Sequence, residues 1–464
     1  MRPMSVVAAT LFAAVLSMDS LHAQVSPPDT LTLTLEEAYR IAAGSNPAYR
    51  QVVNTTTLNG PESRANLFGQ ILPSVSLNLL STGYSGRLTQ QANDFFGNPI
   101  LNPTQSFTYS SNTSQSVSLD WTIQGASLFN DRTRQRLTNR DRGLAESSEM
   151  AGLRASVRRQ FYLVLRERDL LELERSLVEP RRVDLDVAQQ LFRLAQITRV
   201  DVLNAELAIE QQNIAVNVQD RRYEQVLLFL RTLLGDDGLP PLRLQTEDHA
   251  VFDPSGLDLD VLVDRAMDTN PAVRQQGASV ESASHGLKES RNTWWPRLQA
   301  RFTYGRLAQT PGTSGIFDLN PNNDTQSSFS LGLSVPFFGD YFQNQAGIAR
   351  ATVDLDNADE QLRSTRLATA EQVRSAALTL RNGYESHVLA QRSLDIAQEA
   401  LRLAREEYRL GTRTFEQLRD SINQEALARR QVVEADYSFT DGLVTLEEAV
   451  GTTIDGSTTG GGAE

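Results

Sequence analysis

The 464-residue sequence contains no cysteine, a single lysine (Lys288) and only four histidines. Without cysteine the chain can form no disulfide, no thiolate metal site and no lipid-modified N-terminal cysteine. His249, His285 and His387 lie far apart and lack the spacing of a metal site. Because no nucleophile motif or phosphate-binding loop is present either, we expect no catalytic, cofactor-binding or metal-binding residues.

The sequence also lacks any long apolar run beyond residue 23. Before that point Arg2, a nearly all-apolar run at 6–16 and a small residue at Ala23 have the order of a secretory signal peptide, which is too short to span a bilayer as a helix. If the mature protein crosses a membrane, it must do so without an apolar helix. Acids outnumber bases by 57 to 44, for a net charge of −13, which argues against nucleic acid as a partner.

The remaining sequence contains an internal duplication. The helix–turn–helix pattern at Phe192–Asn204 returns 216 residues later at Tyr408–Asp420, and a short helix ending in Asn46-Pro47 returns 224 residues later at Asn270-Pro271. A fixed pattern that recurs in the same order indicates two repeats of one unit. We therefore divide the chain into a signal peptide (1–23), a mobile N-terminal segment (24–32), repeat 1 (33–245), a linker (246–256), repeat 2 (257–451) and a disordered tail (452–464).

Four segments alternate between apolar and polar residues with a period of two, which is typical of β-strands with one apolar face. Their apolar positions are Val75, Leu77 and Leu79; Val117 and Leu119; Leu298, Ala300, Phe302 and Tyr304; and Phe329, Leu331, Leu333 and Val335. Each segment spans about ten residues, the length of a transmembrane β-strand. The alternative is an ordinary antiparallel sheet with one face in water.

Three features favour the membrane interpretation of these strands. The two hairpin connections, near 86–112 and 306–325, are long and polar, like the extracellular loops of membrane barrels. A signal peptide sends the chain outward. Aromatic residues gather at the opposite strand ends, where an interfacial girdle would lie: Trp121, Trp294, Trp295, Phe337 and Phe338. Because four strands cannot close a barrel and an open edge in lipid leaves backbone groups unpaired, the barrel must be shared among chains.

Each hairpin leads into a very long helix, predicted at about 126–194 and 340–410, and each is about 100 Å long at 1.5 Å per residue. Return helices about half as long are predicted at 198–234 and 414–450. Late in the second long helix, apolar residues recur at alternating spacings of three and four, as in a coiled-coil seam: Leu394, Ala397, Leu401, Ala404 and Tyr408. Pro180 should kink or break the first long helix.

With the duplicated openings, the four strands and the two tips, the chain resembles the TolC-type outer-membrane efflux proteins, the outer membrane factor family. The resemblance covers nearly the whole mature chain and both repeats. It implies an α+β channel-tunnel in which three chains share a twelve-stranded outer-membrane barrel and a periplasmic α-barrel of long antiparallel coiled-coil helices. Residues around 235–254 and the C-terminal end would form a belt around the middle of that α-barrel.

The resemblance also implies a function and a set of partners. The homotrimer would be the exit duct of a tripartite efflux or type I secretion system, located in the outer membrane and extending into the periplasm. Its partners would be outer-membrane lipid, a periplasmic adaptor (membrane fusion) protein and an inner-membrane pump or ABC transporter, with no cofactor. The sequence does not identify the exported substrate, since specificity in such systems lies largely with the pump.

In the family pattern, a tyrosine and an arginine of the second tip hold an aspartate of the first and close the periplasmic entrance. These residues fall on Tyr408, Arg413 and Asp201. An arginine can bond a carboxylate with two parallel hydrogen bonds, although an exposed pair contributes only ~0–1 kcal/mol. The alternative is that Asp201 and Arg413 are ordinary solvated charges near helix ends.

The turns of the two tips fall on Ala195 and on Gly411 and Thr412. Ala195 departs from the family pattern, which usually has glycine there. The pattern also places two acids just inside the entrance. Asp420 matches the second, but Gln417 stands where the first is expected, which leaves cation selectivity open.

Two other functions compete with the export duct. A periplasmic coiled-coil scaffold without channel activity would explain the helices, but not four amphipathic strands with aromatic ends. An envelope enzyme would require a catalytic cluster that the sequence lacks.

Overall fold

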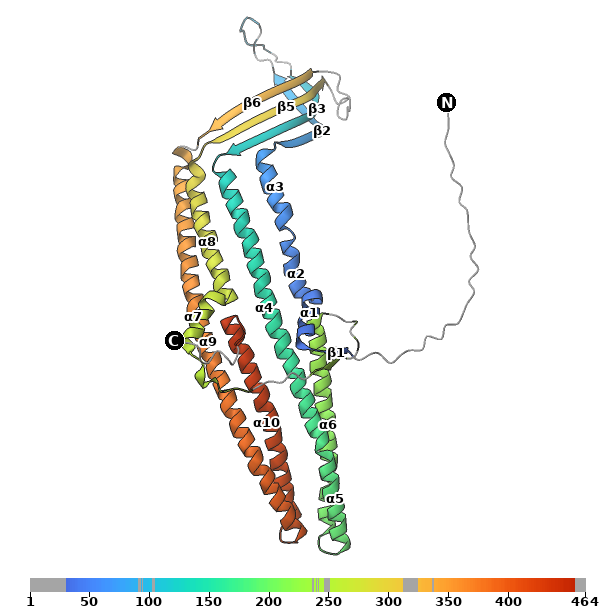
Figure 1. The fold of residues 1–464 in the computed structure, drawn as a ribbon. Coiled ribbons are helices and arrows are strands. Elements are labelled where there is room, and N and C mark those ends of the chain that lie inside the picture. The colour runs from blue at the N-terminus through green and yellow to red at the C-terminus, as the bar shows by residue number, and fades with distance from the viewer. Residues whose placement is uncertain are drawn as a thin grey trace, which may run out of the picture.

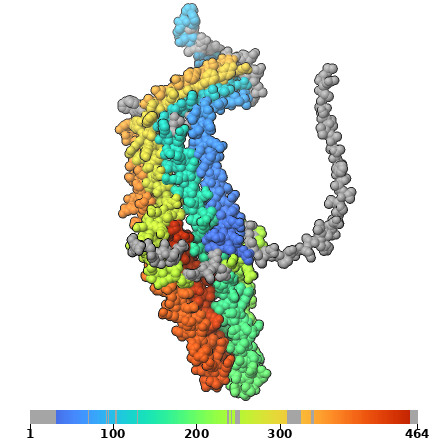
Figure 2. Space-filling model, in the orientation of Figure 1, coloured from blue at the N-terminus to red at the C-terminus, as the bar shows by residue number. Residues whose placement is uncertain are grey.

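The computed structural model describes residues 31–90, 93, 95–101, 105–235, 238, 240, 242–245, 251–311, 324–335 and 338–454. The chain is an elongated molecule with a β-sheet at one end, from which long helices run away nearly side by side (Figures 1 and 2). The predicted signal peptide, residues 24–30 and residues 455–464 lie outside the described residues. No helix in the described ranges combines the length and apolarity needed to cross a membrane.

The two halves of the chain repeat one order of elements. The first half contains α1 (Leu35–Ser45), α2 (Pro47–Thr56), α3 (Asn59–Ile71), β2 (Ser74–Gln90), β3 (Gln105–Gln124), α4 (Ser127–Ser176), α5 (Val178–Arg193) and α6 (Arg199–Leu234). The second contains α7 (Leu259–Thr269), α8 (Pro271–Arg291), β5 (Arg297–Pro311), β6 (Asp324–Ser334), α9 (Phe338–Arg409) and α10 (Phe415–Val450). The predicted long helices, return helices and four strands are all present.

Prolines lie at the helix interruptions in the first half of the chain. Helix α4 ends at Ser176 and α5 begins at Val178, so the predicted interruption near Pro180 is confirmed. Proline has no N–H to bond the carbonyl four residues earlier, and its ring crowds that carbonyl. Pro61 stands at the same place relative to the break between α2 and α3. The corresponding α8 and α9 contain no internal proline and run unbroken for 21 and 72 residues.

Four strands form one antiparallel sheet in the order β2-β3-β5-β6. The register pairs apolar residues with apolar residues and polar with polar. Val75, Leu119 and Phe302 lie in one row on one face of the sheet, and Ser76 and Ser118 lie on the other face. Strands β2 and β6 each have a neighbour on one side only among the described residues. The sheet therefore has one apolar face, one polar face and two edges.

The strands are longer than the ten residues predicted. They contain 17, 20, 15 and 11 residues, and the hairpin connections are correspondingly shorter than expected. The extra length is mostly polar, and its hydroxyl groups bond across the ladder, as between Ser85 and Ser110 (2.9 Å) and between Thr89 and Ser106 (2.8 Å). Pairing of the backbone does not require apolar side chains, so the polar segments extend the strands beyond the alternating pattern.

A small parallel pair near the middle of the molecule was missed by sequence reasoning. Strand β1 (Leu31–Leu33) pairs with β4 (Leu242–Leu244). Leu33, Leu242 and Leu244 enter an apolar cluster with Val157, Phe161 and Leu234. The prediction of a mobile segment to residue 32 is therefore wrong for its last two residues. Three-residue strands carry too little alternation to be recognised in a sequence.

Each Asn-Pro pair joins a short helix to the end of a return helix. The Asn46 side chain accepts a bond from the Tyr49 amide and donates one to the Leu233 carbonyl (2.8 Å). Asn270 likewise caps α8 and donates to the Ala449 carbonyl (2.8 Å). The two return helices end in glycines with left-handed backbone, Gly235 (φ 75°) and Gly451 (φ 85°), packed against the same Asn-Pro turns. The same contact between an Asn-Pro turn and the end of a return helix thus occurs in both repeats.

Candidate gate at the helical tips

Two tight turns close the helix pairs at the end far from the sheet (Figure 1). In the first, the Gln196 amide bonds the Leu191 carbonyl and the Ala195 amide bonds the Phe192 carbonyl. The second repeats this pattern with Thr412 to Glu407 and Gly411 to Tyr408. This is the Schellman motif, which requires a left-handed residue after the helix end.

Ala195 occupies that left-handed position with φ 58°, as Gly411 does with φ 72°. An L-residue with a Cβ is strained there by about 1–2 kcal/mol, whereas glycine is not. We expect Ala195→Gly to stabilise the first tip by about 1 kcal/mol and Gly411→Ala to destabilise the second by a similar amount. Amide hydrogen exchange at the two tips would measure both changes. Exchange at the first tip that is unchanged or faster in Ala195→Gly would contradict the assignment of strain.

Asp201 and Gln417 perform the same local task in the two repeats. Thr198 and Thr414 cap α6 and α10, and in each case the third helical residue bonds back to the cap amide. The Asp201 carboxylate accepts from the Thr198 amide at 2.9 Å and from its hydroxyl at 2.8 Å. The Gln417 side chain accepts from the Thr414 amide at 3.2 Å. A glutamine in place of an acid therefore keeps the capping box.

The structure places the three predicted gate residues close to the tips but joins Arg413 to a different acid. Arg413 Nη1 donates to Glu407 Oε2 at 3.0 Å, across the turn of its own tip. Glu407 was not singled out from the sequence, because its pairing with Arg413 depends on the geometry of the turn between them. Within one chain, Arg413 and Asp201 form no ion pair among the described residues.

Tyr408 is buried between the two helix pairs. Its side chain is 4% exposed and packs in an apolar cluster with Ala188, Leu401, Phe415 and Leu418. Of the predicted coiled-coil seam, Leu401, Ala404 and Tyr408 lie in this cluster. Burial raises the pKa of its hydroxyl to about 12, with further contributions from the negative charges of Asp201 and Asp184. The hydroxyl has no hydrogen-bond partner within the part of the chain that the structure describes.

A groove of about 350 Å³ lies beside Tyr408, between α5 and α9. Asp184 lines it, with Arg405 Nη2 at 3.8 Å from its Oδ2. Burial raises the pKa of the Asp184 carboxyl, and Arg405, Arg181 and Arg409 oppose that shift. The groove was not predicted, because it depends on how α5 turns after the break near Pro180.

The predicted entrance acid, Asp420, is exposed on the first turns of α10. Its Oδ1 lies 3.8 Å from Arg419 Nη2, which is equally close to Glu416. The two acids therefore share one arginine, and any field they create at the entrance is partly compensated within the chain.

Aromatic residues gather where the helices meet the sheet. Trp121 lies on the apolar face of β3 and is 41% exposed, Trp295 is 53% exposed, and Trp294 packs on Tyr341 with ring centroids 5.7 Å apart. Phe337 lies outside the described residues, and Phe338 is the first residue of α9. Two further exposed rings lie on the first turns of α4 and α9, Phe129 (74%) and Phe342 (79%).

Known proteins match both the sequence and the fold. The pattern of the outer membrane efflux protein family matches residues 262–452, which is nearly all of the second repeat. The outer membrane protein TolC of Escherichia coli strain K12 is 23% identical over 309 residues, covering 63% of this chain and 60% of TolC. The second repeat thus matches the outer membrane efflux protein family, and the chain is similar to TolC.

Solved structures extend the likeness to the whole fold. A membrane protein from Pseudomonas aeruginosa superposes with a TM-score of 0.67 at 17% identity, covering 90% of each chain. CusC, a protein that forms a transmembrane channel, superposes with a TM-score of 0.68 at 16% identity, covering 91% of this chain and 94% of CusC. The fold is thus the α+β channel-tunnel fold that these solved structures share.

Proposed function

We propose that three copies of this chain form an outer-membrane exit duct for substrates delivered from the inner membrane. The observation that carries the proposal is the four-stranded sheet, with an apolar face, a polar face and two open edges. In a bilayer, each unpaired edge group would cost several kcal/mol, so β2 and β6 must find partner strands. Pairing β6 of one copy with β2 of the next closes a barrel with a polar interior.

The helices supply the second part of the duct. Helices α4 and α9, with the helices packed beside them, would continue the barrel wall into the periplasm in a closed ring of three copies. A periplasmic adaptor protein would dock at the tips, and an inner-membrane pump or ABC transporter would supply the substrate. In this role the residues of the chain would catalyse no reaction.

The tips would act as the gate of this duct. In the trimer, we propose that Arg413 exchanges Glu407 for Asp201 of the neighbouring copy and holds the tips inward. Tyr408 supports the closed position from inside the cluster that joins α5 to α9. The short distance between Arg413 and Glu407 means that two acids compete for one guanidinium.

We expect Arg413→Ala and Asp201→Ala each to raise the single-channel conductance in planar bilayers. If one exposed tie contributes ~1 kcal/mol, three symmetric ties shift the open population by roughly a hundredfold. The double substitution should add little to either single one, because both remove the same bond. Tyr408→Phe should have a milder effect, since it removes only a hydroxyl.

Glu407→Gln is the matched control for the gate. It removes the competing acid from Arg413 without touching the proposed tie, so the conductance should stay at or below the wild-type value. Wild-type conductance in both Arg413→Ala and Asp201→Ala, with trimers intact, would leave these residues as ordinary surface charges. Absence of any current through the wild-type protein would contradict the duct itself.

A further inference from the structure

The surface just below the sheet carries more positive charge than this acidic chain would suggest. Helix α4 carries three arginines in its first ten residues, and α8 ends with the chain's only lysine, Lys288, followed by Arg291. The two segments lie against each other, because Arg134 of α4 pairs with Glu289 of α8 and Asn292 bonds Asn130 at 3.3 Å.

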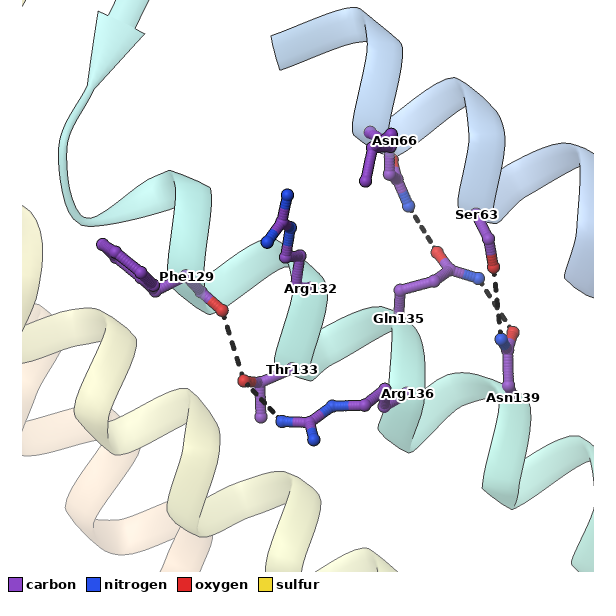
Figure 3. Close-up of a pocket in the computed structure, with 9 residues that line it drawn as sticks. Ser63, Asn66, Phe129, Arg132, Thr133, Gln135, Arg136 and Asn139 are labelled. Atoms are coloured by element: carbon purple, nitrogen blue, oxygen red, sulfur yellow. Dashed lines mark hydrogen bonds between the residues drawn. The ribbon is translucent and has the colours of Figure 1, made fainter. Parts of the chain in front are cut away.

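Two hollows lie on either side of α4 at this level. One, of about 500 Å³, is lined by Leu67 of α3 and by Phe129, Arg132 and Arg136, with no acid in its lining (Figure 3). The other, of about 400 Å³, is lined by Lys288 and Arg291 of α8 and again by Phe129, also with no acid. Since both include Phe129 and Thr133, they adjoin each other across α4. We refer to Phe129, Arg132, Arg136, Lys288 and Arg291 as the basic collar.

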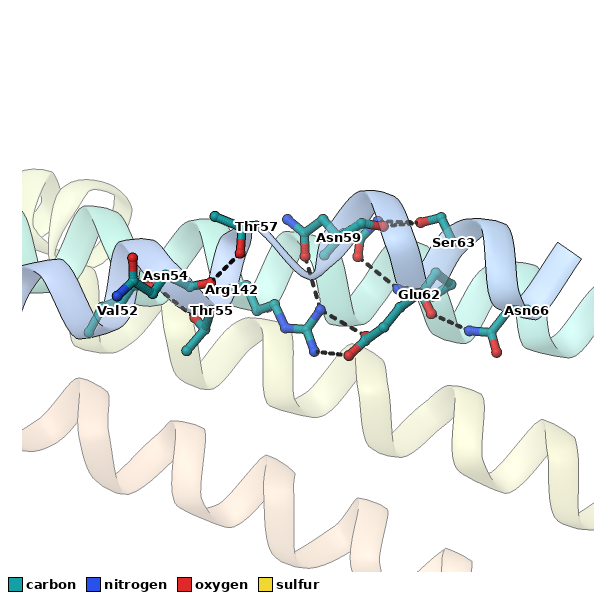
Figure 4. Close-up of polar contacts among 11 residues, drawn as sticks. Val52, Asn54, Thr55, Thr57, Asn59, Glu62, Ser63, Asn66 and Arg142 are labelled. Atoms are coloured by element: carbon teal, nitrogen blue, oxygen red, sulfur yellow. Dashed lines mark hydrogen bonds and ion pairs between the residues drawn. The ribbon is translucent and has the colours of Figure 1, made fainter. Parts of the chain in front are cut away.

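The collar cations differ from their neighbours in having no acidic partner. Arg134 is paired with Asp131 and Glu289, and Arg142, further from the sheet, is held by Glu62 and Asn59 (Figure 4). In contrast, none of the four collar cations has a carboxylate within ion-pair distance in the described part of the chain. In a chain with 57 acids, this leaves their charge available to a ligand.

The exposed ring in the collar indicates that this face is the outer one. Phe129, Arg132 and Arg136 follow one another at spacings of three and four and therefore share one side of α4. The Phe129 side chain is 74% exposed, which suits a lipid-facing surface better than a water-filled interior. The opposite side of the same helix carries small and acidic residues, Ser127 and Asp131.

The depth of the collar corresponds to a headgroup layer. Arg132 lies five residues after the start of α4 and Lys288 six residues before Trp294, which at 1.5 Å per residue is roughly 8–9 Å from these two points, where the helices meet the sheet. The headgroup region on each side of a bilayer is about 5–8 Å thick. Arginine and lysine side chains reach several ångströms along the surface toward such a layer, and aromatic girdles mark its boundary.

We propose that the basic collar binds the phosphate of an anionic phospholipid in the leaflet that faces the periplasm. This inference rests on the proposed membrane barrel. Guanidinium groups bond phosphate oxygens in pairs, and lysine adds a point charge. Phe129 and Leu67 border the same hollows and offer apolar contact to the glycerol and the upper acyl chains. Basic pockets beside membrane-spanning elements bind lipid headgroups in this way.

The single lysine allows a direct test in the wild-type protein. Trimers are placed in nanodiscs of phosphatidylcholine with or without a few per cent of phosphatidylglycerol, and acetylation of Lys288 is followed by mass spectrometry. We expect labelling to slow by about fivefold with the anionic lipid. Soluble glycerol 3-phosphate at the same concentration should give no protection. Equal rates in the two nanodiscs, or equal protection by the soluble phosphate, would overturn the proposal.

Variants separate a specific site from the general field of an anionic bilayer. Arg132→Ala combined with Arg291→Ala should abolish most of the protection of Lys288. The control pair Arg366→Ala with Arg374→Ala removes the same charge from exposed positions in α9, far from the sheet, and should retain it. Protection that survives in the collar variant would overturn the site while leaving the duct intact. A wild-type chain that does not enter nanodiscs as a trimer would overturn the proposed duct and this inference with it.

Discussion

Leu119→Arg or Leu331→Arg is expected to prevent assembly of the protein in the outer membrane. Leu119 shares its row of the sheet with Val75 and Phe302, and Leu331 lies on the same apolar face, 64% exposed in the single chain. An arginine on a lipid-facing position near the middle of the bilayer costs about 2–4 kcal/mol per chain. A barrel of three chains would carry this cost three times. Heat-resistant trimers in membrane fractions would measure the loss.

Ser118→Arg and Ser330→Arg are the matched controls for these substitutions. Each introduces the same side chain one residue away, on the polar face, where Ser118 now meets the hydroxyl of Ser76 at 2.6 Å. Both variants should insert into the membrane and change the conductance instead. The Ser330→Arg trimer should be the less stable of the two, because the new arginine lies opposite Arg301 and the like charges repel. If the leucine and serine variants assemble equally well, the assignment of the two faces is wrong.

Asn270→Ala is expected to be the most damaging single substitution in the helical part. The side chain is 6% exposed and both caps α8 and holds the end of α10 through the Ala449 carbonyl. Losing the cap costs about 1 kcal/mol, and leaving a buried carbonyl unpaired costs about 1–3 kcal/mol more. Asn46→Ala should act similarly in the first repeat. Denaturant titration followed by circular dichroism would measure the loss.

Asn270→Ser separates the two contributions. The serine hydroxyl can still accept the amide bonds at the start of α8, but it is too short to reach Ala449. The variant should therefore recover about 1 kcal/mol of the loss in Asn270→Ala. A serine variant no more stable than the alanine variant would show that the cap contributes nothing at this joint.

Much of this architecture could be predicted because the signals were long or repeated. Helix α9 runs for 72 residues without a proline and carries a coiled-coil seam near its end, and the Asn-Pro and tip patterns occur twice. Contacts between segments distant in sequence could not be read in the same way. The bond from Asn46 to Leu233 spans 187 residues, and nothing in a single sequence indicates which carbonyl an asparagine will reach.

The candidate gate residues show the same limit on a smaller scale. The pattern identified Tyr408, Arg413 and Asp201, and the structure brings all three to the tips. The sequence pattern could not show that Arg413 would form an ion pair with Glu407, since that pairing depends on how tightly the turn at Gly411 closes. The basic collar was missed because its residues come from α4 and α8, and their unpaired charge becomes visible only once the neighbouring acids are placed.

The mass of the protein extracted from membranes tests the central claim most directly. Native mass spectrometry after gentle detergent removal should give a particle of three chains, because two open strand edges per chain have no other partners in lipid. The same particle should be absent from the fraction that is soluble without detergent. A stable single chain that remains in solution without detergent would contradict the account.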